Sequence, residues 1–206
     1  MAAQTIAGQP TSALHRCSWS GGSPLMVEYH DLEWGVPVHD DHVLFEYLLL
    51  DGAQAGLSWS TILNRREGYR EVFSQFDPEV LSKWGEEEVE TALLSPRIIR
   101  NRAKVTSAVR NARAFLEVAR EFGSFDRYMW SFVGGQTVHN SWSEETAIPA
   151  ETDESRSLSK DLKARQFSFV GPTIVYAVMQ SAGLVNDHMV SCFRYRELVA
   201  RDGHQT

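Results

Sequence analysis

Four residues near the two ends of the chain are of the types that hold a metal ion. The chain has only two cysteines, Cys17 and Cys192; His30 follows Cys17 by thirteen positions, and His188 precedes Cys192 by four. Residues four apart share one face of a helix, so we expect His188 and Cys192 to reach one ion. Two sulfurs and two imidazoles would make a closed tetrahedral zinc site, which is structural because no position is left for water. Spacing alone leaves an alternative, that the cysteines are simply buried and His30 packs beside them.

Asp51 is the acid that local rules explain least well. It follows the apolar run Leu48–Leu50 and precedes Gly52. If a helix ends near Gly52, an acid at that end opposes the helix dipole, and burial beside apolar residues costs free energy unless a partner compensates. Residues that break local rules often belong to functional sites, which makes Asp51 a candidate catalytic group. The alternative is an exposed acid at a helix end with no function.

Aromatic residues cluster in the first third of the chain. They include Trp19, Tyr29, Trp34 and Trp59. Aromatic residues at this density pack in a core, yet flat rings are also what a pocket needs to hold an extruded base. The pattern leaves both interpretations open.

A turn with glycine and proline lies between two expected helices, at residues 167–173. The helix after the turn points free N–H groups and the positive end of its dipole outward, so Gly171 and Thr173 are candidates for binding a DNA phosphate. Most such turns bind nothing. This one also departs from the common two-glycine hairpin, which has glycine where Phe169 stands.

The charge pattern excludes a protein that coats nucleic acid through its overall charge, because the net charge is −7. A local basic run nevertheless lies between positions 95 and 115, and an acidic run precedes it. The basic residues are Arg97, Arg100, Arg102, Lys104, Arg110 and Arg113, and the acidic ones are Glu86, Glu87, Glu88 and Glu90. The runs predict either two solvated helix faces or one face that meets phosphates while the other repels them.

Helical periodicity covers almost the whole chain, and we find no alternating strand and no internal repeat, which predicts an all-α fold. Start signals include Ser58 and the run Asp77-Pro78-Glu79, and Gly183 is an expected C-cap. The expected helices cover residues 43–48, 62–69, 101–122, 124–132, 158–165, 173–182 and 188–198, with a loop at 137–149.

The length of 206 residues suits one large domain or two small lobes. We expect a disordered tail at 1–14, a single all-α domain at 15–200, with two lobes as an option, and a flexible end at 201–206. No apolar run is long enough to cross a bilayer and the start does not resemble a signal peptide, so we expect a cytoplasmic protein without membrane contact. Nothing indicates an obligate oligomer, so a monomer is expected.

Several motifs, in order, resemble those of the 3-methyladenine DNA glycosylase I family. The resemblance covers roughly Arg16 to Tyr195 and is carried by residues 29–37, 54–59, 98–104, 130–133, 169–173, 179–180 and 183–188.

The resemblance implies an all-α helix-hairpin-helix DNA glycosylase whose N- and C-terminal segments are joined by one structural zinc ion. It implies that Cys17, His30, His188 and Cys192 are the zinc ligands. It also places Tyr29, Trp59 and the acid at position 51 around the excised base, with Trp19 and Trp34 lining the pocket nearby. The implied substrate is double-stranded DNA with an alkylated adenine, and the products are 3-methyladenine and an abasic site.

Two departures bear on this expectation. The family usually has glutamate where this chain has Asp51, one methylene shorter. The wider superfamily uses a catalytic aspartate near Asp187, but the family is thought to manage without it, so Asp187 is assigned no catalytic role. No lysine stands out as a Schiff-base nucleophile, which predicts a monofunctional enzyme.

Two other functions compete with base excision. One is a catalytically weak or silent, zinc-stabilised module that binds DNA lesions, suggested by the shorter acid. The other is a zinc hydrolase acting on a small molecule, which the closed set of four ligands disfavours.

Overall fold

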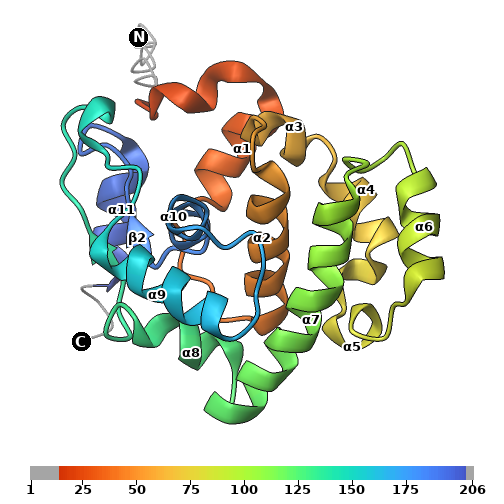
Figure 1. The fold of residues 1–206 in the computed structure, drawn as a ribbon. Coiled ribbons are helices and arrows are strands. Elements are labelled where there is room, and N and C mark those ends of the chain that lie inside the picture. The colour runs from red at the N-terminus through yellow and green to blue at the C-terminus, as the bar shows by residue number, and fades with distance from the viewer. Residues whose placement is uncertain (1–13, 203–206) are drawn as a thin grey trace, which may run out of the picture.

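The computed structural model describes residues 14–202, and within this range the fold is almost entirely helical, as expected (Figure 1). The predicted N-terminal tail, apart from Leu14, and most of the predicted flexible C-terminus lie outside the described residues. No helix in the described part of the chain is long and apolar enough to cross a membrane.

The elements follow one another in a simple chain order. The α-helices are α1 (Pro24–Leu32), α2 (Asp41–Gln54), α3 (Trp59–Leu63), α4 (Arg66–Val72), α5 (Pro78–Leu81), α6 (Glu86–Leu94), α7 (Arg102–Phe122), α8 (Phe125–Ser131), α9 (Asp153–Ala164), α10 (Pro172–Ser181) and α11 (Phe193–Asp202). Short 3₁₀ turns are η1 (Ser18–Gly22), η2 (Ser74–Phe76) and η3 (Glu145–Ala147), and two strands are β1 (Val138–His139) and β2 (Val185–Asn186).

Helix α2 runs through the middle of the molecule. Asp40 caps it by accepting hydrogen bonds from the N–H groups of His42 and Val43. Every residue from Leu44 to Ala53 is buried, so this helix is covered on all sides rather than along one stripe. In Figure 1, α4 to α7 lie on one side of α2, and α8 to α11 lie on the other.

Helix α7 is the long amphipathic helix that the sequence predicts. Asn101 caps it through a hydrogen bond from the N–H of Lys104, and Gly123 ends it in a left-handed conformation, with φ of +88°. Its apolar stripe packs on α2, α5, α6 and α8. The helix therefore connects the two sides of the molecule.

Three details differ from the sequence prediction. Val138–His139 and Val185–Asn186 form a short parallel pair, which is too brief to show alternation in sequence. The expected helix at 62–69 is two helices with a break at Asn64 and Arg65. The last helix begins at Phe193 rather than at His188.

A close backbone contact at the end of α10 positions both candidate sites. Gly183 has a φ of +71°, and a Cβ atom there would lie 2.4 Å from the carbonyl carbon of Val36. Only glycine fits this approach without a shift. The N–H of Gly35 donates to the carbonyl of Gln180, and the N–H of Val38 donates to that of Ala182. The segment after α1 is thereby held against the end of α10.

Candidate metal cluster and active-site pocket

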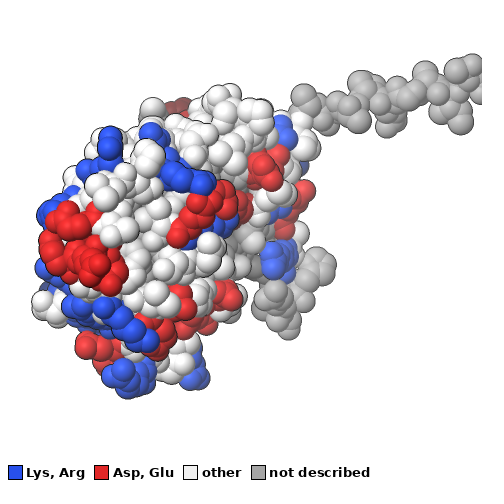
Figure 2. Space-filling model, turned by 90° about the vertical axis from the view of Figure 1, so that its right-hand side faces the viewer, with Lys and Arg blue, Asp and Glu red and all other residues white. Residues whose placement is uncertain are grey.

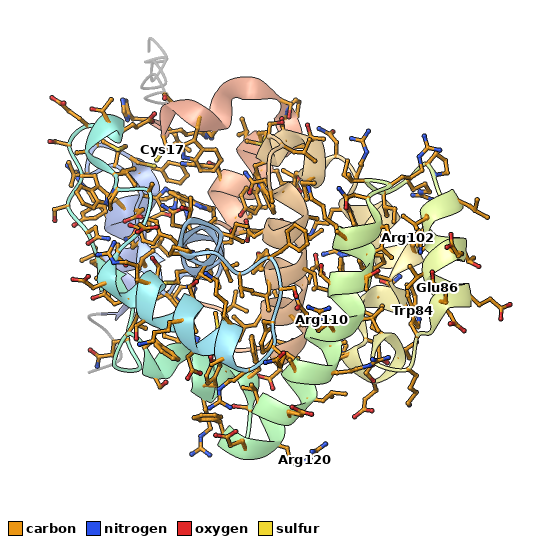
Figure 3. The ribbon with its side chains drawn as sticks, in the orientation of Figure 1. Cys17, Trp84, Glu86, Arg102, Arg110 and Arg120 are labelled. Carbon is orange, nitrogen blue, oxygen red and sulfur yellow. The ribbon has the colours of Figure 1, made fainter. Side chains whose placement is uncertain are left out.

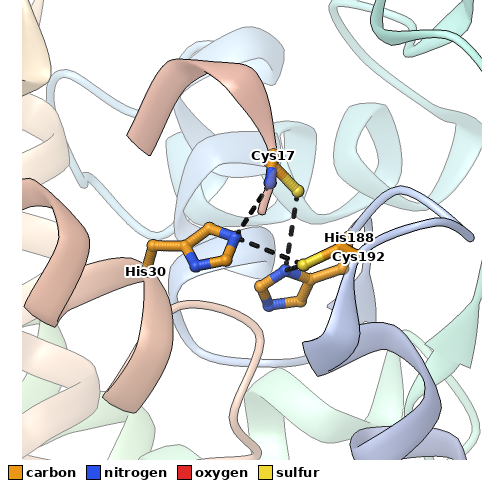
Figure 4. Close-up of side chains that lie close together, drawn as sticks. All are labelled: Cys17, His30, His188 and Cys192. Atoms are coloured by element: carbon orange, nitrogen blue, oxygen red, sulfur yellow. Dashed lines mark hydrogen bonds between the residues drawn. The ribbon is translucent and has the colours of Figure 1, made fainter. Parts of the chain in front are cut away.

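The four predicted metal ligands meet in one buried cluster. The donor atoms of Cys17, His30, His188 and Cys192 all lie within 4.8 Å of one another, although the cysteines are 175 positions apart (192 − 17) (Figure 4). The Cys192 sulfur lies 3.5 Å from His30 Nε2 and 3.6 Å from His188 Nδ1, and the Cys17 sulfur lies 3.7 Å from His188 Nδ1. These four residues could hold a metal ion.

The chemistry of the donor set fits a metal. The second nitrogen of each ring is occupied: His30 Nδ1 donates to Asp31 at 2.8 Å, and His188 Nε2 donates to the carbonyl of Trp34 at 2.9 Å. Such outer partners orient the ring, so that its other nitrogen would be free to bind an ion held among the four residues. Arg16 in turn holds Asp31 with two nitrogens, at 2.7 and 2.9 Å.

The two thiols differ in ionisation, because the hydrogen bond between them raises the pKa of Cys17 and lowers the pKa of Cys192. A hydrogen bond from Cys17, together with those from the two imidazoles, lowers the pKa of the Cys192 thiol although burial opposes it. Partial burial also opposes ionisation of Asp31, but the hydrogen bonds from Arg16 and His30 outweigh it and lower the pKa of that carboxyl. Thiolate and imidazole are the forms that bind transition metals.

The route by which the ligands meet corrects one prediction. His188 and Cys192 do not share a helix face, because both precede α11. A tight turn brings them together instead, closed by a hydrogen bond from the N–H of Cys192 to the carbonyl of Met189. A spacing of four residues is compatible with such a turn as well as with a helix.

A pocket of about 410 Å³ opens beside the cluster. Asp51, in the last turn of α2, lines it, and so do all four of the predicted aromatic residues: Trp19, Tyr29, Trp34 and Trp59. The remaining lining residues are Met26, Gln54, Ser58, Ser60, Ile148, Ala177, Gln180 and Ser181. The structure therefore brings together every residue that the sequence assigned to the base.

Asp51 is the least satisfied group in this pocket. Its side chain is only 2% exposed, and its Oδ2 atom has no hydrogen-bond partner among the described residues. Burial raises the pKa of Asp51 to about 8, and the Ser181 hydroxyl offsets this only in part. A buried carboxyl whose oxygen has no partner beside a cavity can accept a hydrogen bond from a ligand, and such groups are candidates for functional sites.

The aromatic walls pack against each other at angles. The rings of Tyr29 and Trp59 are 5.1 Å apart, and those of Trp19 and Trp34 are 4.9 Å apart. The Tyr29 hydroxyl donates to Ser181 at 3.0 Å. Trp59 Nε1 is buried without a partner in the described part of the chain. The walls are apolar and flat, which suits a planar ligand.

The metal cluster and the pocket share two of these walls. The Trp19 ring lies 5.3 Å from the His30 ring, and the Trp34 ring lies 4.6 Å from the His188 ring. Trp34 also accepts the His188 hydrogen bond through its carbonyl. Displacing the ligands would therefore move the pocket lining.

Lys104 offsets the unfavourable position of Asp51 at the end of α2. Its ammonium group donates to the carbonyls of Ala53 and Ala55, at 2.8 and 2.7 Å. A cation at this end stabilises the negative pole of the helix and satisfies carbonyls that α2 leaves free. Lys104 comes from α7, far from Ala53 and Ala55 in the sequence, so no local pattern predicts this contact.

Sequence reasoning missed the contribution of α10 to the pocket. Ala177, Gln180 and Ser181 line it from one face of this helix. Their spacing of three and four residues is the signal that could have found them. Ile148, from the expected loop, offered no signal because the loop has no period.

Asp187 lies behind the pocket and does not line it. Its carboxylate accepts four hydrogen bonds, from Asn140, Trp142, Tyr176 and Gln180, at 2.5 to 2.8 Å. The side chain is 1% exposed. A carboxylate with this many partners is a structural hub, and through Gln180 it holds one lining residue in place.

The predicted phosphate-binding turn has the expected outline. Gly171 is the N-cap of α10, Thr173 is exposed, and no atom lies within 4 Å of a Cβ placed on Gly171. Phe169 has a φ of +56°, the left-handed conformation that glycine adopts most easily. The backbone thus keeps a glycine-like turn although the residue is phenylalanine.

The basic and acidic runs are not segregated as one of the sequence interpretations proposed. Arg102 pairs with Glu86 and Glu90 across the α6–α7 contact, and Arg97 pairs with Glu71. Figure 2 shows the two signs of charge interspersed on this side of the molecule. Much of the basic run is therefore neutralised locally.

Comparison with protein families finds a match to the methyladenine glycosylase model over residues 19–195. Among characterised proteins, the chain is 46% identical to DNA-3-methyladenine glycosylase 1 of Escherichia coli K12, over 88% of this chain and 97% of that one. It is 43% identical to DNA-3-methyladenine glycosylase of Haemophilus influenzae, over 86% and 96%.

Comparison with solved structures finds the same family. A crystal structure of 3-methyladenine DNA glycosylase I superposes with a TM-score of 0.85 at 47% identity, covering 87% of this chain and 98% of that one. The enzyme of Staphylococcus aureus, described in terms of 3-methyladenine recognition, superposes with a TM-score of 0.85 at 33% identity, covering 88% and 96%.

Proposed function

This chain belongs to the methyladenine glycosylase family and is a DNA-3-methyladenine glycosylase, and we propose that the pocket around Asp51 is where it releases the base. One observation carries the proposal: Asp51 presents an unpartnered carboxyl oxygen from a buried position in a cavity walled by aromatic rings. One solved relative is a tyrosine-to-phenylalanine variant with 3-methyladenine bound, and another is a glutamate-to-glutamine variant. Among the residues that line the pocket of this chain, Tyr29 is the one tyrosine and Asp51 the one acid.

The lesion explains what the pocket has to do. Methylation at N3 puts positive charge on adenine, so the base leaves as a neutral molecule and the glycosidic bond is intrinsically weak. Asp51 accepts a hydrogen bond from the exocyclic amine, and its charge favours the cation. Tyr29 and Trp59 stack on the electron-poor ring, gaining an attraction that normal adenine does not offer. Flipping adds selectivity, because a damaged base costs less to unstack.

The reaction itself is a hydrolysis. The oxygen of a water molecule bonds to C1′ of the sugar, the electrons of the C1′–N9 bond pass to the base and neutralise it, and the water gives up a proton. The products are free 3-methyladenine and an abasic site. No lysine lines the pocket, which supports a monofunctional enzyme without a lyase step.

The raised pKa of Asp51 implies that its protonation state differs between the empty and the base-bound pocket. At neutral pH the empty pocket holds a largely protonated acid, since burial lifts the pKa to about 8. A cationic base that enters the pocket favours the ionised form, so base binding releases a proton. The enzyme thereby avoids keeping a bare charge in an apolar cavity.

We assign one zinc ion per chain to the cluster of Cys17, His30, His188 and Cys192, as a structural metal. The four ligands fill a tetrahedral ion, and the ion would supply cross-linking rather than catalysis. We further assign contacts with a DNA phosphate to Gly171 and Thr173 at the start of α10, and we expect the enzyme to act as a monomer on double-stranded DNA.

The proposal is tested by the release of 3-methyladenine from methylated duplex DNA, measured by chromatography of free bases. We expect release by the wild type and a loss of about 10-fold or more in Asp51→Asn, because a charge-assisted hydrogen bond contributes about 1.5–3 kcal/mol. Asp51→Glu, which restores the usual family acid, should release at least as fast as the wild type. A wild type that binds lesions but releases nothing would instead support the silent DNA-binding module. Equal rates in Asp51→Asn and wild type would refute the role of Asp51.

A further inference from the structure

A second cavity, separate from the base pocket, lies between α7 and the turn that joins α9 to α10. It has a volume of about 510 Å³ and shares no lining residue with the base pocket. We propose that this groove binds the phosphate backbone of DNA beside the lesion, with Arg110 as its central contact. The proposal rests on the proposed function, because it places the same DNA on a second surface.

The lining of the groove suits a phosphodiester. Its members are Arg102, Ala103, Thr106, Ser107, Arg110, Ser168 and Phe169. Two are cations and three carry hydroxyl groups, while no acid is among them. Guanidinium and hydroxyl groups are the usual side-chain donors to DNA phosphates. On a chain with net charge −7, a groove without acids is a place where a polyanion can approach.

Arg110 is the free charge of the groove. Its guanidinium donates to the Ser168 hydroxyl at 3.1 Å, and it forms no ion pair among residues 14–202. Arg102 is different, because Glu86 and Glu90 already neutralise it. Lys104 and Arg113 lie nearby and are not neutralised by a carboxylate, because they donate to main-chain carbonyls. Of the two lining cations, Arg110 is therefore the one without a carboxylate partner in the described part of the chain.

The groove is rigidly joined to the turn that we assign to a phosphate. Asn111, the neighbour of Arg110, accepts a hydrogen bond from the N–H of Ser168 at 2.8 Å and donates to its carbonyl at 3.0 Å. Both backbone groups of Ser168 are thus clamped to α7. Arg110 and the start of α10 keep a fixed separation, as two contacts to one DNA strand require.

Figure 3 shows how the arginines of α7 are distributed along the helix. Arg110 lies beside the α9–α10 turn, Arg102 lies toward α6, and Arg120 lies at the opposite end of the helix. Arg120 is exposed like Arg110 but does not line the groove. It is a matched control, because its removal changes the net charge equally.

The test measures equilibrium binding to a duplex that contains a stable abasic analogue, by fluorescence anisotropy at several salt concentrations. Loss of one phosphate contact should weaken binding several-fold at all sequences and reduce the slope of log affinity against log salt by about one. We expect this for Arg110→Ala and not for Arg120→Ala. Arg110→Lys, which keeps the charge, should restore most of the slope.

Binding of free 3-methyladenine should not change in Arg110→Ala, because the groove and the base pocket are separate. An unchanged salt slope in Arg110→Ala would overturn the proposal, and so would an equal loss in Arg120→Ala. DNA binding is measured independently of base release, so the groove is judged by these outcomes even if the wild type releases no base.

Discussion

The metal cluster and the base pocket are neighbours with shared walls, but they treat buried polar atoms in opposite ways. In the cluster, each imidazole has an acceptor for its second nitrogen, and the four donor atoms face one another. In the pocket, Asp51 Oδ2 and Trp59 Nε1 have no partner in the described part of the chain. The first arrangement pairs its buried groups within the protein, and the second leaves two buried polar atoms without a partner beside a cavity.

The difference indicates that the metal cluster stabilises the fold, whereas the pocket lowers the stability of the fold. Satisfied buried groups stabilise a fold, whereas a buried acid without a partner costs free energy. Substitutions in the cluster should therefore reduce stability, and substitutions in the pocket should reduce activity with little loss of stability.

The largest effect is expected for Cys192→Ser. The variant should lose its bound metal, because serine does not replace a thiolate ligand. At a metal concentration about 1,000-fold above Kd, binding adds about 4 kcal/mol of stability, so the Tm should fall by about 10 °C. Elemental analysis and thermal unfolding measure both effects. As a control, His42→Gln, which alters an exposed histidine of α2, should keep about one zinc per chain. A wild type that is stable and contains no metal would show that the four residues do not form a structural metal site.

Trp59→Ala, a substitution in the base pocket, should reduce activity more than stability. Stacking on a base contributes about 1–3 kcal/mol, so release of 3-methyladenine should slow by about 5- to 160-fold. The Tm should change far less than in Cys192→Ser, because Trp59 is only half-buried. Release kinetics and thermal unfolding of the same preparation test this, with Trp59→Phe as the conservative control. A large fall in Tm without slower release would show that Trp59 stabilises the fold and does not bind the base.

Asp31→Asn refines the account of the cluster. Its carboxylate orients His30 without touching the metal, and loss of such an outer partner lowers metal affinity by about 10- to 100-fold. Competition with a chromogenic chelator measures the change. Arg16→Ala removes the outer ion pair of Asp31 but keeps the carboxylate, and it should have a smaller effect. Equal affinities in Asp31→Asn and wild type would show that His30 is oriented by packing alone.

Asp51→Asn should change stability with the opposite sign, and the size of its effect should depend on pH. The folded-state pKa of about 8 lies above the ordinary value of 3.8, so between these values the folded chain binds more protons than the unfolded chain. The stability of the wild type must then fall as pH rises from about 4 to 8. The variant lacks this loss and should gain relative to the wild type by up to about 1.4 kcal/mol per pH unit. Urea unfolding at pH 5, 6, 7 and 8 tests the trend; a constant difference would show that Asp51 is ionised in the empty pocket.

Much of the fold could be predicted because its helices carry local signals. Ser58, Asp77, Asn101 and Ser124 each cap the helix that the sequence predicts. The two-residue strands could not be predicted, since they are too short to show alternation and they pair segments far apart in the sequence. The start of α9 was placed five residues late, because its first turn is polar and only Thr152 caps it.

The candidate site was predicted unevenly for the same reason. Residue types alone suggested the metal ligands, and the family resemblance strengthened that prediction and placed Asp51 and Tyr29 around the base. The support of Asp51 by Lys104 could not be foreseen, because it joins α7 to α2 through main-chain carbonyls that any residue carries. The sequence assigns Asp187 no catalytic role, and in the structure its carboxylate accepts four hydrogen bonds and does not line the pocket.

The cluster also determines how the chain would respond to force. Cys17 lies near the first described residue and Cys192 near the last. When a metal ion joins them, a pull on the two ends would run through Cys17, the ion and Cys192, and would bypass every helix from α1 to α10. The helices would then carry no load until a metal–thiolate bond breaks.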